Sequence, residues 1–319
     1  MISWILLIVL GFILLVKGAD LLVDGASNIA KKFHIPEIII GLTIVSIGTS
    51  LPELIVSTTS AINGYSDLAI GNVVGSNIAN LLLILGLSAI IKAISFKRET
   101  RLIEIPICLA VSIAFMILAN LGQDITRIDA IVLVALFIAF IIYTIVMAKK
   151  GEEFEKEEKD IEETQNTNNQ STIKNIIFII LGIVLLKIGG DLTVDNAVNV
   201  AKFFNLSEKL IAVTILAVGT SLPELVTSVS AAIKGKSDIA IGNILGSNIF
   251  NILLIIGTTA LIKPIVYNVN YNIDMFFMIL ATFILSLFPI IPPKSKMTRG
   301  NGIVYVLLYI IYLITLFVK

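Results

Sequence analysis

Cysteine, histidine and charged residues are all scarce in this sequence of 319 residues. Cys108 is the one cysteine and lies in an apolar run, which excludes disulfides and cysteine-ligated metal sites within the chain. His34 is the one histidine, which excludes zinc chemistry based on histidine. Charged residues make up 14% of the chain, against roughly 25% in an ordinary soluble protein. These residues are too few to cover a soluble fold of this length.

Hydrophobic residues are abundant instead, at 57% of the chain. This composition indicates a polytopic membrane protein and excludes a soluble enzyme, a nucleic-acid binder and a small disulfide-rich secreted domain. The 23 basic and 23 acidic residues cancel, so no overall field favours a polyanionic partner. We therefore expect the lipid bilayer, and no nucleic acid, as the protein's surroundings.

Apolar stretches close to membrane-spanning length occur ten times and predict an all-α protein with ten transmembrane helices. They cover about 2–24, 36–62, 67–91, 103–121, 126–148, 173–194, 208–233, 238–262, 271–290 and 302–318. The first stretch lacks the basic start and small-residue cleavage motif of a signal peptide, so we expect it to be retained.

The two halves of the chain repeat each other. A shift of 171 residues places 43–82 on 214–253 without gaps, with 25 of 40 positions identical. The predicted organisation is a first five-span repeat at 1–148, an acidic linker at 149–171 and a second five-span repeat at 172–319. Because five is odd, the second repeat must enter the membrane from the opposite side, which is a transporter architecture.

Lysine and arginine predict the orientation of these spans in the membrane. With the N-terminus outside, the inner segments hold sixteen of these residues and the outer segments hold five. Basic residues concentrate on the cytoplasmic side of membrane proteins. We therefore expect a plasma-membrane protein with both termini extracellular and residues 149–171 in the cytoplasm.

The segment GTSLPE occurs at 48–53 and again at 219–224, each time within an apolar stretch. Proline removes a backbone donor and clashes with the carbonyl four residues earlier, so each segment should kink or break its helix. The carbonyl groups freed near Ser46 and Ala217 need a partner, which a bound cation can provide where the break lines a cavity. Threonine and serine add hydroxyl oxygens, and glutamate adds the negative charge.

Glu53 and Glu224 occupy equivalent positions in the two repeats. A carboxylate at membrane depth costs on the order of 3 kcal/mol on insertion scales, so a matched pair predicts a functional site. The alternative is a protonated glutamate hydrogen-bonded within the bundle.

A second pair of segments carries a polar stripe. Asn72, Ser76 and Asn80 are four residues apart and share one helix face, and Asn243, Ser247 and Asn251 repeat the pattern. Hydrogen bonding between helices is the alternative function of this stripe, and the neighbouring glycine pairs are typical of close helix packing. With two carboxylates and many neutral oxygens, the set suits Na⁺ and Ca²⁺ rather than zinc or copper.

With these paired segments, the sequence resembles the sodium/calcium exchanger family of the cation/calcium antiporter superfamily, in its compact prokaryotic form. The two GTSLPE segments and the two GN-x-x-GSNI-x-N segments look like the α-repeats of that family. The resemblance implies four cation sites in a diamond near the midplane. It implies carboxylate ligands at Glu53 and Glu224, hydroxyl ligands at Thr49, Ser50, Thr220, Ser221, Ser76 and Ser247, carbonyl ligands at Ser46 and Ala217, and a central polar pair at Asn80 and Asn251.

One position departs from the family pattern. Well-described members have aspartate where this chain has Asn251, and both copies here carry asparagine. Asparagine is a near-isosteric neutral substitute for a protonated aspartate, so an aspartate that stays protonated could be replaced without a change of stoichiometry. Potassium-dependent relatives are acidic at one of these positions, so Asn80 and Asn251 argue against K⁺ coupling.

The resemblance also implies that the first and sixth spans move to alternate access. Lys17 lies three residues before Asp20, and Lys187 lies four residues before Asp191. These spacings predict charge pairs within each helix.

The sequence thus predicts a non-enzymatic Na⁺/Ca²⁺ antiporter with Na⁺ and Ca²⁺ as transported ions and no cofactor. It would work by alternating access and be electrogenic, and a monomer is compatible with the layout. A Ca²⁺/H⁺ antiporter is the first alternative, although proton/calcium exchangers carry a GNxxE signature instead of GTSLPE. A cation channel is the second alternative, because broken helices also occur in channels.

Overall fold

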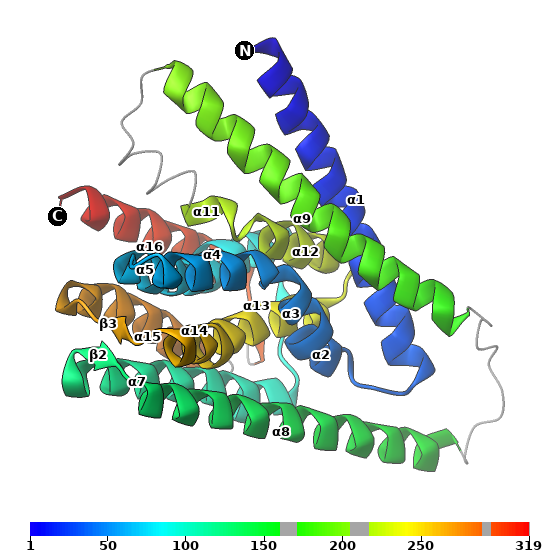
Figure 1. Cartoon of the computed structure of the whole chain (residues 1–319). Coiled ribbons are helices and arrows are strands. Elements are labelled where there is room, and N and C mark those ends of the chain that lie inside the picture. Colours follow the sequence, from blue (N-terminus) through cyan, green and yellow to red (C-terminus); the bar gives the residue numbers. More distant parts are fainter. Residues whose placement is uncertain (160–170, 205–216, 289–294, 319) are drawn as a thin grey trace.

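The computed structural model describes residues 1–159, 171–204, 217–288 and 295–318, which form a bundle of long helices (Figure 1). Within these residues, eight helical segments are long and apolar enough to cross a membrane. They are α1 (Ile2–Lys32), α5 to α6 (Ser66–Ile91), η3 with α7 (Thr100–Gly122), α8 (Arg127–Lys159), α9 (Thr172–Phe203), α13 to α14 (Ser237–Ile262), η6 with α15 (Val269–Leu287) and α16 (Arg299–Val318).

A ninth span is broken in the middle, as the GTSLPE segment predicts. It consists of α2 (Glu37–Ile40), η1 (Gly41–Val45), α3 (Ser46–Thr49) and α4 (Leu51–Ile62), with a bend of 49° at Ser50. Its repeat counterpart contains α11 (Ala217–Gly219) and the apolar helix α12 (Leu222–Ile233). The first part of the seventh predicted span, residues 208–216 of 208–233, lies outside the described residues.

Helix α8 extends beyond the predicted span 126–148. It continues to Lys159, within the segment 149–171 that the sequence predicts as the acidic linker. Residues 149–159 are mostly lysine and glutamate, which are good helix formers. Adding them to an existing helix needs no new nucleus, so the helix extends beyond the apolar part of the span.

Two short β-ribbons mark the two ends of the bundle and refine the all-helical prediction. At one end, β1 (Ile94–Ser95) pairs with β4 (Lys296–Met297), and at the other end β2 (Asp124–Ile125) pairs with β3 (Ile265–Val266). The 171-residue shift relates β1 to β3, which belong to different ribbons. Corresponding loops of the two repeats therefore lie at opposite ends, as the inverted arrangement requires.

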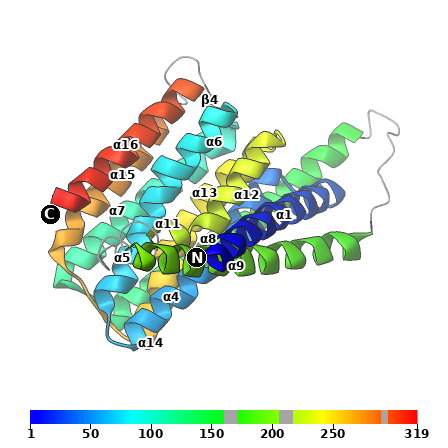
Figure 2. The same cartoon turned by 90° about the horizontal axis from the view of Figure 1, so that it is seen from above.

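The longest helices of the two repeats, α1 and α9, lie side by side and cross the bundle obliquely (Figure 1). Glycines allow their backbones to touch: a Cβ atom on Gly11 would lie 2.8 Å from the Gly189 carbonyl oxygen, and one on Gly18 would lie 2.8 Å from that of Gly182. The shift relates Gly11 to Gly182 and Gly18 to Gly189, so this contact is itself symmetric. Helices α15 and α16 lie on the side of the bundle away from α1 and α9 (Figure 2).

The centre of the bundle is formed by α5 (Ser66–Ile78) and α13 (Ser237–Phe250) with the segments that follow them. In the most apolar window of Ser237–Ile262, 94% of the residues are buried, against 22% for Arg299–Leu316. Each central helix changes to a π-helix, η2 (Ala79–Ile84) or η5 (Asn251–Ile256), close to the asparagine pair of the polar stripe. Such π-bulges occur frequently at functional sites.

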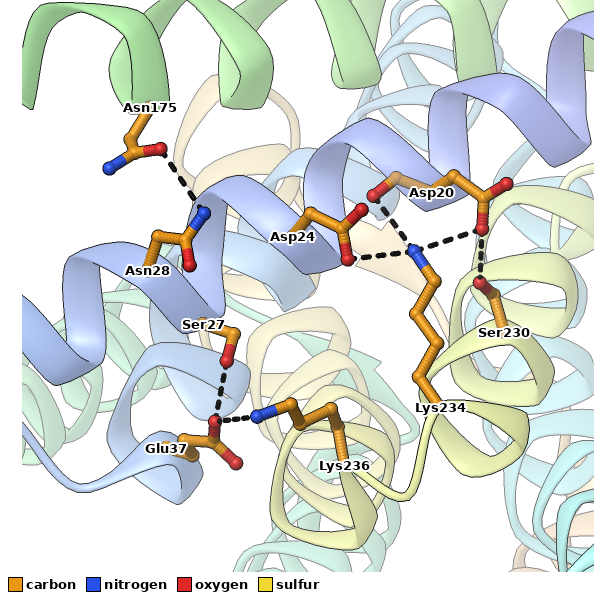
Figure 3. Close-up of polar contacts among 9 residues, drawn as sticks. All are labelled: Asp20, Asp24, Ser27, Asn28, Glu37, Asn175, Ser230, Lys234 and Lys236. Atoms are coloured by element: carbon orange, nitrogen blue, oxygen red, sulfur yellow. Dashed lines mark hydrogen bonds and ion pairs between the residues drawn. The ribbon is translucent and has the colours of Figure 1, made fainter. Parts of the chain in front are cut away.

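The two predicted intrahelical charge pairs have different outcomes. Lys187 Nζ lies 2.6 Å from an Asp191 carboxylate oxygen, which confirms the pair in α9. Asp20 forms an ion pair with Lys234 of the other repeat at 3.0 Å, a contact that the sequence did not predict, and its pairing with Lys17 stays a prediction (Figure 3). The Asp20 carboxylate faces the end of α12, and Lys234 reaches it from there.

A pair of equivalent glycines provides a stability test. A Cβ atom on Gly246 would lie 2.7 Å from the Leu42 carbonyl oxygen, whereas one on Gly75 meets nothing within 4 Å. We expect Gly246→Ala to lower the free energy of unfolding by about 1–3 kcal/mol through overpacking. Gly75→Ala is the matched control and should not lower it, because no atom of the described residues lies within 4 Å of the added Cβ. Thermal melting of both purified variants measures the difference, and equal melting temperatures would contradict this packing.

Candidate cation site

Two glutamates lie at the centre of the bundle and are bonded crosswise. Glu53 and Glu224 are 0% and 1% exposed. Ser221 Oγ donates to Glu53 Oε1 at 3.3 Å, and Ser50 Oγ donates to Glu224 Oε1 at 2.8 Å. Each glutamate therefore accepts a hydrogen bond from the serine of the other GTSLPE segment. The two broken spans meet at these bonds, so the predicted carboxylates lie in one site made by both repeats.

The threonines of the two segments are held by the first asparagine of each polar stripe. Thr49 Oγ1 lies 3.1 Å from Asn243 Oδ1, and Thr220 Oγ1 lies 3.3 Å from Asn72 Oδ1. The amide groups of these asparagines donate at 2.9 Å to serine hydroxyls, from Asn72 to Ser57 and from Asn243 to Ser228. Sequence reasoning missed these two serines, although each lies four residues after a motif glutamate and so shares its helix face.

Ser76 completes the surroundings of Glu53, because its Oγ lies 3.5 Å from Glu53 Oε1. The Ser46 carbonyl, predicted to be free, accepts the Ser50 N–H at 3.0 Å and the Thr49 hydroxyl at 3.3 Å. The chain therefore satisfies this carbonyl within the broken helix itself. Ala217 begins α11 directly after 205–216, which lie outside the described residues.

Four buried asparagines join the two central helices. Asn80 Nδ2 donates to Asn248 Oδ1 at 3.0 Å, and Asn251 Nδ2 donates to Asn77 Oδ1 at 2.9 Å. Asn77 and Asn248 also donate to each other's backbone carbonyl at 3.2 and 3.3 Å. Asn77 and Asn248 thus orient the central pair, a function that their position off the main stripe did not reveal.

Several oxygens of this set are left for another partner. Among the described residues, five buried oxygens of predicted ligands have no hydrogen-bond partner: Glu53 Oε2, Glu224 Oε2, Ser247 Oγ, Asn80 Oδ1 and Asn251 Oδ1. A buried acceptor without a partner costs about 1–3 kcal/mol, and more when it is charged. Hard cations such as Na⁺ and Ca²⁺ take oxygen ligands of these kinds. In the described chain no group of three acidic, histidine or cysteine side chains could hold a metal, so neutral oxygens must supply most of the ligands.

A cavity of about 430 Å³ reaches this site from one end of the bundle. Its inner wall includes Asn72, Gly75 and Thr220, which belong to the polar set or adjoin it. Its outer wall includes Asp67 and Tyr271, near the end that carries β2 and β3. The site is thus approached from the β2–β3 end.

Comparison with known proteins agrees with this architecture. The family model described as "Sodium/calcium exchanger protein" matches residues 3–146 and 174–318. The chain is 36% identical to the putative antiporter CaxA of Alkalimonas amylolytica over 97% of both chains, and 35% identical to the sodium/calcium exchanger MaX1 of Methanosarcina acetivorans over 98% of both. It is 36% identical to the inner membrane protein YrbG of Escherichia coli over 88% of this chain and 87% of that one.

Solved structures give the same result. The chain superposes on the sodium-calcium exchanger NCX_Mj, soaked with Na⁺ and Ca²⁺, with a TM-score of 0.83 and 32% identity, covering 98% of this chain and 97% of that one. Further structures of NCX_Mj soaked with Sr²⁺ match to a similar degree. The two segments of the family match correspond to the two repeats.

The asparagine quartet predicts how firmly the repeats are joined. We expect Asn248→Ala to lower the free energy of unfolding by about 1–3 kcal/mol, because it leaves the buried Asn80 amide without its acceptor. Asn120→Ala is the control: Asn120 and Asn272 bond reciprocally at 2.9 Å, but Asn120 and this bond are exposed, so its cost should be within about 0.5 kcal/mol. Chemical or thermal unfolding of both variants tests this, and equal losses would refute the assignment.

Proposed function

Because the chain belongs to the sodium/calcium exchanger family, we propose that it is a Na⁺/Ca²⁺ antiporter that exchanges the two ions by alternating access. The observation that carries this proposal is the pair of buried glutamates, bonded crosswise by serines and surrounded by oxygens without partners. The two inverted repeats contribute equally to this site, which is where transporters built from such repeats bind their ions.

The charge of the site accounts for exchange. Two ionised glutamates carry a charge of −2, which one Ca²⁺ or two Na⁺ ions neutralise. The two ions compete for overlapping oxygens around Glu53 and Glu224. The empty site is a buried double negative charge, so the unloaded protein should resist the change between conformations. This resistance enforces exchange over leak.

The proposed ligands are those predicted from the sequence. The two carboxylates form the centre of the set, together with the three other oxygens that lack a hydrogen-bond partner, Ser247 Oγ, Asn80 Oδ1 and Asn251 Oδ1. The remaining hydroxyl and carbonyl oxygens complete it. The full proposed set is Glu53, Glu224, Thr49, Ser50, Thr220, Ser221, Ser76, Ser247, Asn80, Asn251 and the carbonyl groups of Ser46 and Ala217. The Ser46 carbonyl would exchange one of its two present hydrogen bonds for the ion. Each ion can be bound by oxygens alone, and no cofactor is required.

The proposed orientation places the β1–β4 end in the cytoplasm of the cell. The lysine and arginine bias supports it, since loops at this end hold Lys97, Lys234 and Lys296. Both termini and the cavity that reaches Thr220 then face outward, and the protein resides in the plasma membrane. In this orientation, inward Na⁺ movement would drive Ca²⁺ out of the cell.

Flux measurement tests the function and the site together. We expect a Na⁺ gradient to drive ⁴⁵Ca²⁺ movement in proteoliposomes, and Glu53→Gln or Glu224→Gln to reduce it by at least about tenfold. A charge-assisted interaction is worth about 1.5–3 kcal/mol, and each substitution removes one. Glu104→Gln is the matched control, because Glu104 is also a fully buried glutamate in a span but lies outside the proposed site.

The outcomes separate the alternatives. Undiminished flux in the Glu53 or Glu224 variants would refute the site. Ca²⁺ movement driven by a pH gradient without Na⁺ would identify a Ca²⁺/H⁺ antiporter. Uncoupled conductance at channel rates would identify a cation channel.

The stoichiometry predicts a response to voltage. If Asn251 replaces a neutral ligand, three Na⁺ ions exchange for one Ca²⁺ and each cycle moves one net charge. An inside-negative potential set with K⁺ and valinomycin should then accelerate Na⁺ entry coupled to Ca²⁺ exit. A rate that is independent of voltage would instead indicate two Na⁺ ions per Ca²⁺, in agreement with the charge of −2.

A further inference from the structure

A group of ion pairs closes the β1–β4 end of the bundle. Lys234 Nζ lies 3.0 Å from Asp20 Oδ1 and 2.8 Å from Asp24 Oδ1, and it also donates to the Asp20 carbonyl at 3.2 Å (Figure 3). One ammonium group in the turn after α12 thus holds two carboxylates on successive turns of α1. These contacts cross from the second repeat to the first.

A second lysine of the same turn makes a similar contact. Lys236 Nζ lies 2.8 Å from Glu37 Oε1, and the same oxygen accepts the Ser27 hydroxyl of α1 at 2.6 Å (Figure 3). Ser230 of α12 adds a hydrogen bond to Asp20 at 2.9 Å. We call the contacts of Lys234 and Lys236 with Asp20, Asp24 and Glu37 the α1–turn network.

The network is partly withdrawn from water. The two lysine side chains are 27% and 25% exposed and Glu37 is 22% exposed, whereas Asp20 and Asp24 are 39% and 54% exposed. Within the described chain, the large cavity that reaches the site lies at the opposite end. The network therefore holds the β1–β4 end closed, while the cavity approaches the site from the β2–β3 end.

The repeat relationship makes this network one-sided. The 171-residue shift places Asp20 on Asp191 and Asp24 on Asp195, so α9 repeats the two acids of α1. The same shift places Lys234 on Asn63 and Lys236 on Tyr65. The turn after α4 therefore lacks the lysines that the turn after α12 provides. Asp191 is bonded instead to Lys187 of its own helix.

This asymmetry has a conformational consequence in a protein with inverted repeats. Exchanging the conformations of the two repeats would close the β2–β3 end, with α9 against the turn after α4. Asp191 and Asp195 would then approach Asn63 and Tyr65, neither of which is charged. Lys263 also lies at this turn, but its repeat counterpart Lys92 lies at the turn after α12, so this lysine does not distinguish the two ends. We propose that Lys234 and Lys236 are positioning residues that bias the protein toward the conformation closed at the β1–β4 end. This inference rests on the alternating access of the proposed function.

The expected bias is modest but measurable. Partly exposed ion pairs each contribute about 0.2–1 kcal/mol, and Lys234 makes two of them. Removing Lys234 should therefore change the ratio of the two conformations by roughly two- to thirtyfold. Such a change alters which side binds ions more readily without any contact to the ions.

Equivalent cysteine reporters can measure this ratio. Ser60 lines the cavity, whereas its repeat counterpart Ala231 is fully buried beside α1. In a Cys108→Ala background, we would introduce Ser60→Cys or Ala231→Cys separately into the full chain and time the reaction with a membrane-impermeant thiol reagent. In the parent, Ser60→Cys should react faster.

Two substitutions should shift the ratio in the same direction. Lys234→Asn removes the network, and Asn63→Lys supplies the missing counterpart at the other end. Each should raise the labelling of Ala231→Cys relative to Ser60→Cys by roughly two- to thirtyfold. Lys234→Arg should preserve the parent ratio. Lys187→Asn is the matched control, because it removes a Lys–Asp pair within one helix, which moves as a unit, and should leave the ratio unchanged.

The results distinguish this inference from the proposed function. An unchanged ratio in both Lys234→Asn and Asn63→Lys would overturn the inference, as would an equal shift in Lys187→Asn. Asn63→Lys adds a side chain without removing a contact, so it provides the answer if Lys234→Asn does not fold. Na⁺-driven ⁴⁵Ca²⁺ flux of the parent is measured separately. Its absence would overturn the proposed function, whereas the labelling ratio would still report on the network.

Discussion

The burial of two carboxylates at the centre of an apolar bundle is the constraint on which the rest of this structure depends. Within the part of the chain that the structure describes, neither glutamate has a basic partner, and each is stabilised by hydroxyl groups, above all by the serine of the other repeat. Hydroxyl groups reduce the cost of a buried charge but do not neutralise it. The remaining charge attracts a cation. The buried carboxylates therefore lower the stability of the fold and, for the same reason, bind an ion.

The inverted duplication follows from the same constraint. A site of this kind needs ligands from two broken helices that approach from opposite sides of the membrane, and two copies of one unit provide them. The four asparagines, which follow the glutamates along the chain of each repeat, join the two copies. The central helices α5 and α13, with the π-helices after them, pack close enough for bonds between side-chain amides. Symmetry here is a means of placing equivalent oxygens around one centre.

Local rules predicted much of this arrangement and missed what depends on the third dimension. Proline and glycine in GTSLPE predicted the break at Ser50, and the repeat predicted that Glu53 and Glu224 would meet. The crosswise serine bonds could not be predicted, because they depend on how the two breaks face each other. The helical periodicity placed Asn77 off the polar stripe, yet its Oδ1 accepts a hydrogen bond from Asn251 across the interface. The sequence could not show this, because it depends on which face of α5 meets α13. The extension of α8 to Lys159 was missed because apolar length was taken as the limit of the helix.

The differences between the repeats are as informative as their likeness. Gly75 and Gly246 are the same residue at equivalent positions, yet a Cβ on Gly246 would touch a backbone, whereas one on Gly75 would meet nothing within 4 Å among the described residues. An exchange of conformations between the repeats would reverse a difference of this kind. Lys234 and Asn63 differ in the sequence itself, so their difference cannot reverse. A transporter with identical repeats would favour neither conformation, since the two would have equal energy. The lysines without a counterpart, Lys234 and Lys236, make the two energies unequal. The residues that bind the ions are therefore matched between the repeats, whereas the residues that bias which side is open are not.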